Sequence, residues 1–256
     1  DVSPNLSNRL IGPLAKRISV AFADSLNYFP KQKTLHLGNP VREAILEVAG
    51  VPAEQAREKL GFDPALPLVL VTGGSQGARH LNQVVCETLP ELLMYCQVLQ
   101  ISGSKLFEET RSQAEQVLTG QNEAVKARYR VVPYMDDEMA LALQASSLVV
   151  CRAGAATLSE LAILGKPCLL VPLPPAIGGS PQEVNAFMFA RKQAAKVLKD
   201  GELTRPNLAK SIRSMLSSDE ALRRMAEATL QLAKPHATED IAAEVVRIAQ
   251  RGRIKG

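Results

Sequence analysis

Residues 68–79 decide the fold, and their sequence is Leu68-Val-Leu-Val-Thr-Gly-Gly-Ser-Gln-Gly-Ala-Arg79. The first half is an unbroken apolar run, which predicts a buried parallel strand. Glycines and small polar side chains then interrupt the run, and a helical pattern begins at Ala78. Such a turn ends at a helix N-terminus, where free N–H groups and the helix dipole favour a diphosphate. We expect Gly74 to let the backbone approach the anion, and Ser75 and Gln76 to donate side-chain hydrogen bonds to it.

A second segment repeats this plan. Its sequence is Leu148-Val-Val-Cys-Arg-Ala-Gly-Ala-Ala-Thr-Leu-Ser-Glu-Leu-Ala162, which predicts a strand, a glycine-containing turn and a helix. Two such turns at the carboxyl ends of parallel strands can face one crevice, where ligands bind in open α/β sheets. Glu160 suits ribose hydroxyls as an acceptor, but an acid in the first turn of a helix also complements the helix dipole without any ligand. Glycine-rich turns also occur in α/β proteins that bind no nucleotide.

Strand and helix patterns alternate along the rest of the chain, which predicts an α/β fold with a doubly wound parallel sheet. Leucines at four-residue spacing predict a helix around residues 5–17, and short strands follow at 18–22 and 34–37. Asn39-Pro40 marks a domain junction. After Thr204 the spacing is helical only. The strands expected in the larger domain are 66–72, 97–102, 129–133, 147–151, 167–171 and 196–198.

The composition is that of a globular protein, with 46% hydrophobic residues, 22% charged residues and a net charge of +4. No apolar run approaches the roughly 18 residues of a membrane-spanning helix, and no signal peptide opens the chain, so we expect a cytoplasmic location. The C-terminus is basic at Arg251, Arg253 and Lys255. This is typical of a solvated tail and also suits an anionic membrane surface. We expect no nucleic-acid partner.

The residues that bind metals elsewhere do not form a metal motif in this chain. The acids at 136–138 are more typical of a helix start, with Asp136 as the N-cap. We therefore expect neither a metal nor a cofactor, and we assign none of the three histidines as a base. The four cysteines lack CxxC spacing and fall in or beside apolar or helical patterns, which predicts small buried side chains in a reducing compartment; they are Cys86, Cys96, Cys151 and Cys168.

Four motifs together resemble the MurG family. They are Gly-Asn-Pro-Val-Arg at 38–42, residues 71–78 with Asn82, residues 151–160, and Gln182 with Asn185-Ala186. They occur in the family's order and cover most of the chain. The resemblance implies the two-domain GT-B glycosyltransferase fold. It also implies an inverting, metal-independent hexosyltransferase, which moves GlcNAc from UDP-GlcNAc to lipid I (undecaprenyl-pyrophosphoryl-MurNAc-pentapeptide) to form lipid II in peptidoglycan biosynthesis.

The resemblance also implies a set of donor-binding residues. Arg42 neutralises the donor diphosphate, the backbone at Met135 contacts the uracil ring, and Gln182 hydrogen-bonds the GlcNAc hydroxyls with Asn185 nearby. The loop before Gln182 departs from the family pattern at Ser180-Pro181, which leaves the details of sugar recognition open. The start of the helix after the second turn completes the set: Ala155, Ala156, Thr157, Leu158, Ser159 and Glu160.

The first residues of the chain resemble a segment that lies well inside the family's N-terminal acceptor domain. We therefore expect 1–40 to be the end of that domain, 41–235 the donor domain, and 236–256 a closing helix, which in the family packs across the first domain, with a basic tail. In the family the general base lies upstream of these residues. We assign no catalytic residue, expect the chain to be inactive alone, and expect the enzyme at the cytoplasmic face of the bacterial plasma membrane.

Three other interpretations remain open at this point. Another GT-B transferase, such as a diacylglycerol glycosyltransferase, would share the nucleotide turns but differ around Gln182. A nucleotide-sugar-binding subunit with a separate membrane partner would more typically start with Met just before the strand at 66–72. A dinucleotide-binding module is disfavoured, because the GxGxxG fingerprint is missing after this strand.

Overall fold

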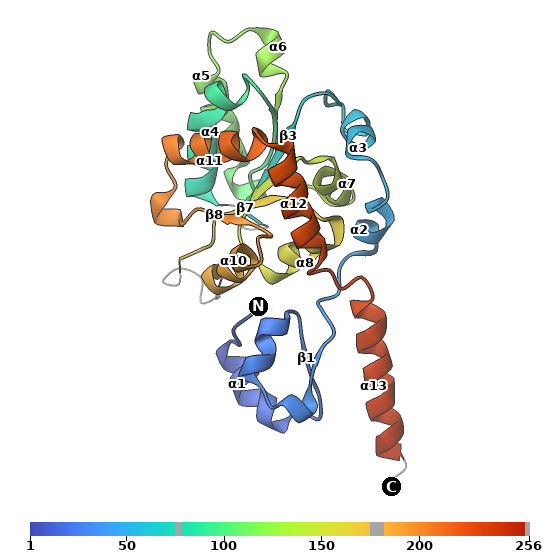
Figure 1. Cartoon of the computed structure of the whole chain (residues 1–256). Helices are drawn as coiled ribbons and strands as arrows, with labels where there is room; N and C mark the ends of the chain where they lie inside the picture. The colour runs from blue at the N-terminus through green and yellow to red at the C-terminus, as the bar shows by residue number, and fades with distance from the viewer. Residues whose placement is uncertain (75–77, 175–181, 254–256) are drawn as a thin grey trace.

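A six-stranded parallel sheet forms the centre of the larger part of the molecule (Figure 1). The structure is a computed structural model that describes residues 1–74, 78–174 and 182–253. The strand order is β5-β4-β3-β6-β7-β8, and every neighbouring pair is parallel. All six strands lie within or overlap the ranges expected from the sequence: β3 (Leu68–Thr72), β4 (Gln97–Ile101), β5 (Tyr129–Val132), β6 (Leu148–Cys151), β7 (Cys168–Leu170) and β8 (Lys196–Val197).

Alternate residues of the strands face two separate hydrophobic cores, one on each side of the sheet. Leu68 and Leu70 of β3 belong to one core, and Val69 and Val71 belong to the other. This alternation explains why the strand sequences are apolar throughout, since both faces of the sheet are covered by helices. The first core is covered by α2 (Glu43–Val48), α3 (Ala53–Lys59), α7 (Glu138–Ala145), α8 (Ala155–Leu164) and α10 (Gln182–Arg191), and the second by α4 (Arg79–Leu92), α5 (Phe107–Val117), α6 (Glu123–Lys126) and α11 (Arg205–Leu216).

One further helix, α12 (Asp219–Leu230), packs against α8 and α11 at the side of the domain. Its last residue meets the end of α8, where Gly165 has a φ of +59° and caps the helix in the left-handed conformation. A Cβ at Gly165 would lie 2.6 Å from Cγ of Leu230. This glycine therefore both ends α8 and makes room for α12.

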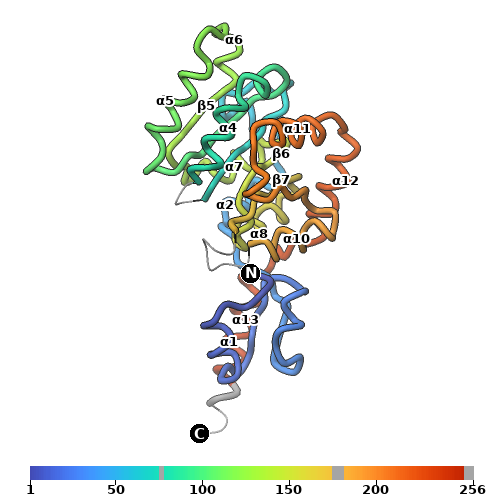
Figure 2. The backbone as a smooth tube through the Cα atoms, turned by 90° about the vertical axis from the view of Figure 1, so that its left-hand side faces the viewer, coloured from blue at the N-terminus to red at the C-terminus, as the bar shows by residue number. Residues whose placement is uncertain are grey.

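The first 37 residues form a small segment below the larger domain (Figures 1 and 2). It contains α1 (Leu6–Ile11) and a two-stranded parallel sheet of β1 (Ile18–Val20) and β2 (Thr34–His36). The expected helix at 5–17 is shorter than the leucine spacing predicted. It ends at Ile11 because Gly12-Pro13 begins a tight 3-10 turn, and proline cannot donate the next helical hydrogen bond.

The closing helix α13 (Ala237–Arg253) lies beside this segment, as both views show (Figures 1 and 2). Arg17 and Glu244 join them through an ion pair of 3.0 Å between Nε and Oε1. The two connections to the larger domain, at Gly38 and at Lys234, also lie close together. A Cβ at Gly38 (φ +95°) would clash with Cβ of Lys234, so only glycine fits there. The closing helix thus lies against the first segment of the chain.

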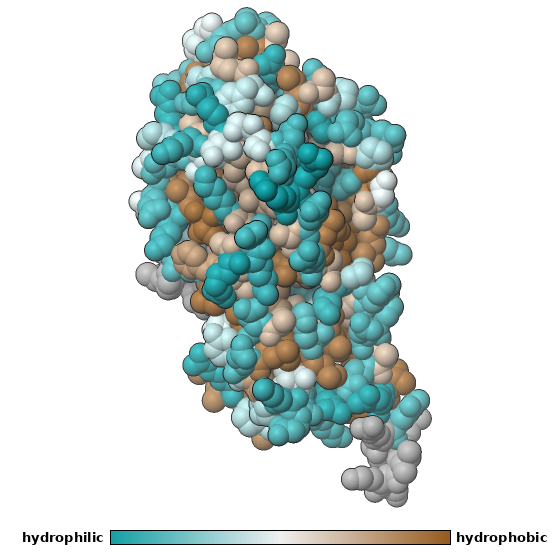
Figure 3. Space-filling model, in the orientation of Figure 1, coloured by the Kyte–Doolittle hydropathy of each residue, from teal (hydrophilic) through white to brown (hydrophobic). Residues whose placement is uncertain are grey.

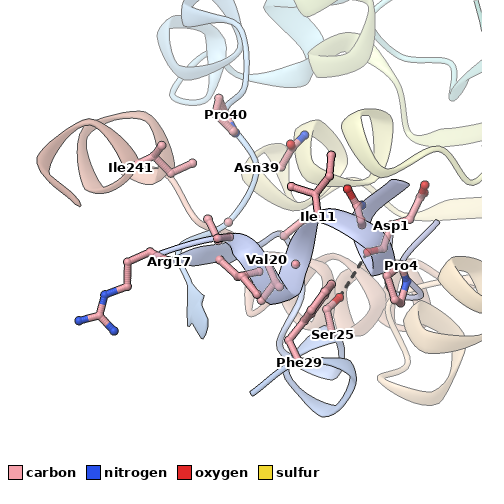
Figure 4. Close-up of a pocket in the computed structure, with 17 residues that line it drawn as sticks. Asp1, Pro4, Ile11, Arg17, Val20, Ser25, Phe29, Asn39, Pro40 and Ile241 are labelled. Carbon is pink, nitrogen blue, oxygen red and sulfur yellow. Dashed lines mark hydrogen bonds between the residues drawn. The ribbon is translucent and has the colours of Figure 1, made fainter. Parts of the chain in front are cut away.

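An open cavity of about 410 Å³ lies between α1, β1, the linker at 38–40 and α13 (Figure 4). Apolar side chains such as Ile11, Val20, Phe29 and Ile241 line much of it. Around it, α1 and the turn that follows expose large apolar side chains, with Leu14 being 85% exposed. Figure 3 shows apolar patches among the polar residues of this lower part as well as on the larger domain.

The helices of the described ranges are each too short or too polar to cross a bilayer. All four cysteines are buried, as the sequence predicted. Burial raises the pKa of the Cys86 thiol to about 11 and those of Cys96 and Cys151 to about 12. These thiols are therefore neutral packing groups.

Candidate functional site

The two glycine turns lie side by side at the carboxyl edge of the sheet. β3 and β6 are neighbours, with Thr72 directly opposite Cys151. The chain leaves β3 toward α4 on one face of the sheet and leaves β6 toward α8 on the other face. This is the point where the strand order reverses, and ligands of open α/β sheets bind in the crevice outside it. Both strands end at this edge of the sheet, and a crevice shared by the two turns stays a prediction.

The turn after β3 is built for close approach of a ligand to the backbone. Gly74 has a φ of +81°, which disfavours other residues, and a Cβ at this position would meet no atom of the described residues within 4 Å. The N–H of Gly74 donates a hydrogen bond of 3.3 Å to Oγ1 of Thr72, which bends the chain back at the end of the strand. Two predicted residues of this turn, Ser75 and Gln76, lie outside the described residues.

The turn after β6 presents the N-terminus of α8. Gly154 is the N-cap, and within the described residues no side chain caps the helix. The N–H groups of Ala155, Ala156 and Thr157 belong to the first turn, which has no intrahelical acceptors. Ala156 is exposed and Ala155 and Thr157 are partly buried, and their helix follows the strand that pairs with β3.

Two residues of this helix that were predicted to bind the sugar donor, Leu158 and Ser159, make contacts within the protein. Leu158 is fully buried in the hydrophobic core, and its N–H donates to the carbonyl of Gly154 at 3.0 Å. The hydroxyl of Ser159 donates to the carbonyl of Ala155 at 2.9 Å, and the residue is buried. In the structure both residues support the helix, and their role in donor binding stays a prediction.

Glu160 and Arg42 are paired with each other. Nε of Arg42 lies 2.9 Å from Oε1 of Glu160, and one terminal nitrogen lies 3.2 Å from Oε2. Arg42 comes from the linker immediately before α2, whereas Glu160 is the sixth residue of α8. The alternative interpretation of Glu160 as a first-turn acid is therefore wrong, because the helix dipole acts mainly on the first turn. Glu160 lies in the second turn of α8, and Arg42 meets it there, so this pair stands near the N-terminal end of the helix.

Met135 and Gln182 lie on the same edge of the sheet as the glycine turns. Met135 follows β5 and packs its partly buried side chain against the core. Gln182 stands at the start of α10, where its Oε1 accepts a hydrogen bond of 3.0 Å from the N–H of Leu173. This bond closes the base of the loop between β7 and α10. Ser180 and Pro181, where the loop departs from the family pattern, lie outside the described residues.

Asn185, predicted to lie near the sugar, is held by hydrogen bonds at both ends of its amide. Its side chain is fully buried, accepts from the N–H of Val2 at 2.8 Å, and donates to Asp1 at 2.8 Å and to the carbonyl of Ala153 at 2.9 Å. These bonds occupy both ends of the amide. Asn185 therefore fastens the first residues of the chain to the turn after β6, and its role in substrate binding stays a prediction.

A charged cluster beside the site was missed by the sequence analysis. The buried Arg152 donates from Nη1 to Oδ1 of Asp200 at 2.6 Å and to the carbonyl of Val171 at 3.0 Å. Oδ2 of Asp200 lies 3.3 Å from Nδ1 of His80, in the first turn of α4. Arg152 stood inside the second motif, but nothing in the sequence linked it to Asp200. Among the residues of the described ranges, no cluster of three or more metal-ligating side chains is present.

Residues 68–244 match the family model "Glycosyltransferase family 28 C-terminal domain". A transferase of Caldanaerobacter subterraneus subsp. tengcongensis is 35% identical over 93% of this chain and 63% of its own length; it is named UDP-N-acetylglucosamine–N-acetylmuramyl-(pentapeptide) pyrophosphoryl-undecaprenol N-acetylglucosamine transferase. A transferase of the same name from Desulforamulus reducens is 35% identical over 97% of this chain and 66% of its own. This chain thus spans less than two thirds of the length of these relatives.

Solved structures show the same likeness. The crystal structure of MurG from Acinetobacter baumannii has a TM-score of 0.73 and 26% identity, and the match covers 96% of this chain and 65% of that one. A UDP-GlcNAc 2-epimerase from Neisseria meningitidis, solved with UDP-GlcNAc bound, has a TM-score of 0.65 at 14% identity over 93% of this chain and 63% of its own. The second likeness concerns the fold alone.

Proposed function

We propose that this chain, which belongs to the family of glycosyltransferase family 28 C-terminal domains, is the UDP-GlcNAc-binding part of a MurG-type transferase. The observation that carries the proposal is the direct pairing of β3 with β6, which brings two glycine turns together at the switch point of a GT-B donor domain. The reaction we propose for the whole enzyme is transfer of GlcNAc from UDP-GlcNAc to lipid I, which gives lipid II in peptidoglycan biosynthesis. The relatives named above share one activity, which favours this function over a diacylglycerol glycosyltransferase.

The proposed donor site combines backbone N–H donors with the charged side chains of Arg42 and Glu160. The turn at Gly74, with Ser75 and Gln76, and the first turn of α8 hold the diphosphate, because free N–H groups and the helix dipole stabilise anions. Glu160 accepts from the ribose hydroxyls, and the backbone at Met135 contacts the uracil. Gln182 meets the sugar. No metal or cofactor is part of the proposal, and the partner on the acceptor side is the undecaprenyl-pyrophosphoryl-MurNAc-pentapeptide.

The proposed chemistry is inverting transfer. The C4 hydroxyl of the muramyl sugar attacks the anomeric carbon of GlcNAc while the bond to UDP breaks. The negative charge that grows on UDP is stabilised by Arg42 and by the backbone donors around Gly74 and α8. The hydroxyl proton passes to a general base that we assign to none of the described residues. We keep the division into 1–40, 41–235 and 236–256, with donor binding in the middle part.

We also propose that the enzyme works as a peripheral protein at the cytoplasmic face of the plasma membrane. The support is the lipid nature of the proposed acceptor and the basic C-terminal sequence with Arg251, Arg253 and Lys255. Basic clusters of this kind attract anionic lipid headgroups, and added salt weakens the attraction. Sedimentation with anionic and with zwitterionic vesicles tests this point. Equal binding to both vesicle types would contradict it.

Calorimetric titration of the chain with UDP-GlcNAc, UDP-galactose and UDP tests the donor site. We expect saturable binding that prefers UDP-GlcNAc to UDP-galactose. Ser75→Ala and Glu160→Ala should each weaken binding by about tenfold, since each removes a hydrogen bond to the ligand. Glu239→Ala, an exposed acid on α13, is the matched control and should bind as the unchanged chain does. A folded sample that binds none of the three ligands would contradict the proposal.

A further inference from the structure

We propose that Asp200 is a positioning residue of the nucleotide site, which holds the diphosphate-facing turns in place through Arg152 and His80. This inference rests on the proposed function. Within residues 1–74, 78–174 and 182–253, the side chain of Asp200 bonds to Arg152 and His80 and to no predicted ligand-binding residue. Its carboxylate instead joins two residues that flank the crevice: Arg152 follows β6 directly, and His80 is the second residue of α4.

The cluster connects the ends of four neighbouring strands. Arg152 lies in the turn between β6 and α8, and its Nη1 also donates to the carbonyls of Val171 and Pro172 after β7, at 3.0 and 3.4 Å. Asp200 begins the turn after β8. His80 lies on α4, the helix that follows the Gly74 turn, and its contact with Asp200 joins this helix to the cluster. One carboxylate thus links the loops after β3, β6, β7 and β8, which are consecutive in the sheet.

The burial of these groups makes the contacts strong and specific. The side chains of Arg152 and Asp200 are only 9% and 17% exposed, whereas His80 is about half exposed. Burial alone raises the pKa of Asp200, but the hydrogen bond and charge of Arg152, together with His80, outweigh it and lower the pKa below its ordinary value. The carboxylate is therefore ionised at neutral pH, and a charge-assisted bond holds it to Arg152.

A purely stabilising role explains the cluster less well. Nε of Arg152 is buried, and among the described residues it has no hydrogen-bond partner. Buried ion pairs are often no more stabilising than apolar residues of the same size, and an unpaired buried donor adds a penalty. A positioning role explains the arrangement better, because the guanidinium of Arg152 donates to the carbonyls of Val171 and Pro172, which follow β7. The same residue shapes the turn that precedes α8.

Titration of three variants with UDP and with uridine tests the inference. Asp200→Ala should weaken UDP binding by about tenfold, because the turns lose the charged hydrogen bond that positions them, and should leave uridine binding unchanged. The reason is that only UDP carries the diphosphate that the two turns hold. Asp200→Asn keeps an oxygen for Arg152 and should recover part of the affinity. Glu202→Ala, an exposed acid in the same turn, is the control and should bind both ligands normally.

A double variant then separates positioning from general stability. If Asp200 acts through His80, His80→Ala and Asp200→Ala should weaken UDP binding less than additively when combined. His80→Gln alone, at a half-exposed position, gives a folded variant should Asp200→Ala fail to fold, and it should weaken UDP but not uridine.

Three results would overturn the inference. In the first, Asp200→Ala or His80→Gln lowers the unfolding midpoint, but the folded variant binds UDP with unchanged affinity. The second is an equal loss of UDP and uridine affinity. In the third, the unchanged chain binds neither ligand, which would overturn the proposed function and this inference with it.

Discussion

At the scale of single residues, the side chains of Arg42 and Glu160 form an ion pair with two hydrogen bonds. Both are predicted to contact the donor, at the diphosphate and the ribose respectively. Their bidentate ion pair therefore competes with two ligand contacts at once. Because Arg42 is 43% exposed, the competition is weak, and the pair holds both side chains near the crevice at little cost.

This competition predicts opposite effects of one substitution on two ligands. Arg42→Gln should weaken UDP binding by about tenfold, because the diphosphate loses a charged partner. The same change should strengthen uridine binding by about two- to threefold, because it frees Glu160 for the ribose at the small energy of an exposed ion pair. Titration with both ligands measures this, and Arg205→Gln, an exposed arginine of α11, is the control. A loss for both ligands would show that Arg42 does not restrain Glu160.

Lys166 gives a prediction about pH. Burial lowers its pKa to about 8, the nearby charge of Arg57 contributes in the same direction, and Nζ donates to the carbonyls of Gln144 and Ser146. Between pH 8 and 10.5 the unfolded chain therefore binds more protons at this position than the folded chain. The free energy of unfolding contributed by Lys166 should rise with pH in this window, by at most about 3 kcal/mol.

The difference between the unchanged chain and Lys166→Met isolates this contribution, because all other titrating groups are common to both. Urea unfolding at pH 7.5, 9 and 10.5 should show the unchanged chain gaining stability relative to the variant. A constant difference across these pH values would mean that the buried amine keeps an ordinary pKa.

At the scale of elements, the strands were the most predictable feature. Runs such as Leu68–Thr72 are apolar because both sides of the sheet are buried, and this double burial leaves an unbroken signal in the sequence. The positions of the two glycine turns followed from the same runs. The end of α1 was less predictable, since the leucine spacing continues to Leu14 although Gly12-Pro13 interrupts the helix.

Contacts between distant side chains were not predictable. His80 and Asp200 are 120 positions apart, and Asn185 meets Val2 across 183 positions. A single pair of polar side chains produces no periodicity, so nothing in the sequence distinguished a buried Asn185 from one that faces a sugar. The burial of Leu158 was predictable, because the helical period places this position on the core side of α8.

The contact between α8 and α12 provides a stability prediction. Gly165→Ala places a Cβ at a positive φ and within 2.6 Å of Leu230, so it should lower the free energy of unfolding by about 1–3 kcal/mol. Adding Leu230→Ala should restore part of this loss by removing the clash. Gly50→Ala, where the Cβ would meet nothing within 4 Å, is the control and should be nearly neutral. Urea unfolding measures all four proteins, and an unchanged midpoint for Gly165→Ala would refute the packing argument.

At the scale of the whole molecule, the small N-terminal segment is the least self-sufficient part. Its two-stranded sheet leaves one edge of β1 without a partner among the described residues. Leu6, Leu10 and Leu14 expose most of their surface nearby. Exposed apolar patches and open strand edges both favour association between molecules.

We therefore expect the chain to self-associate with rising concentration. Light scattering after gel filtration should show an increasing apparent mass, and the double variant Leu10→Lys, Leu14→Glu should reduce it. Met94→Glu, at an exposed apolar residue of the larger domain, is the control and should leave the association unchanged. A constant monomer mass for the unchanged chain over the tested concentrations would contradict the expectation.

The strand order also has a consequence for how the chain is made. β3 is synthesised before every other strand of the large sheet, yet it lies at the centre and needs neighbours on both sides. One neighbour, β4, follows soon after, but β6 is complete only about 80 residues later. At roughly 5–20 residues per second, the ribosome takes about 4–16 s to supply that strand. During this interval the edge of β3 that later pairs with β6 has no partner, and such an unpaired edge makes a growing chain prone to aggregation.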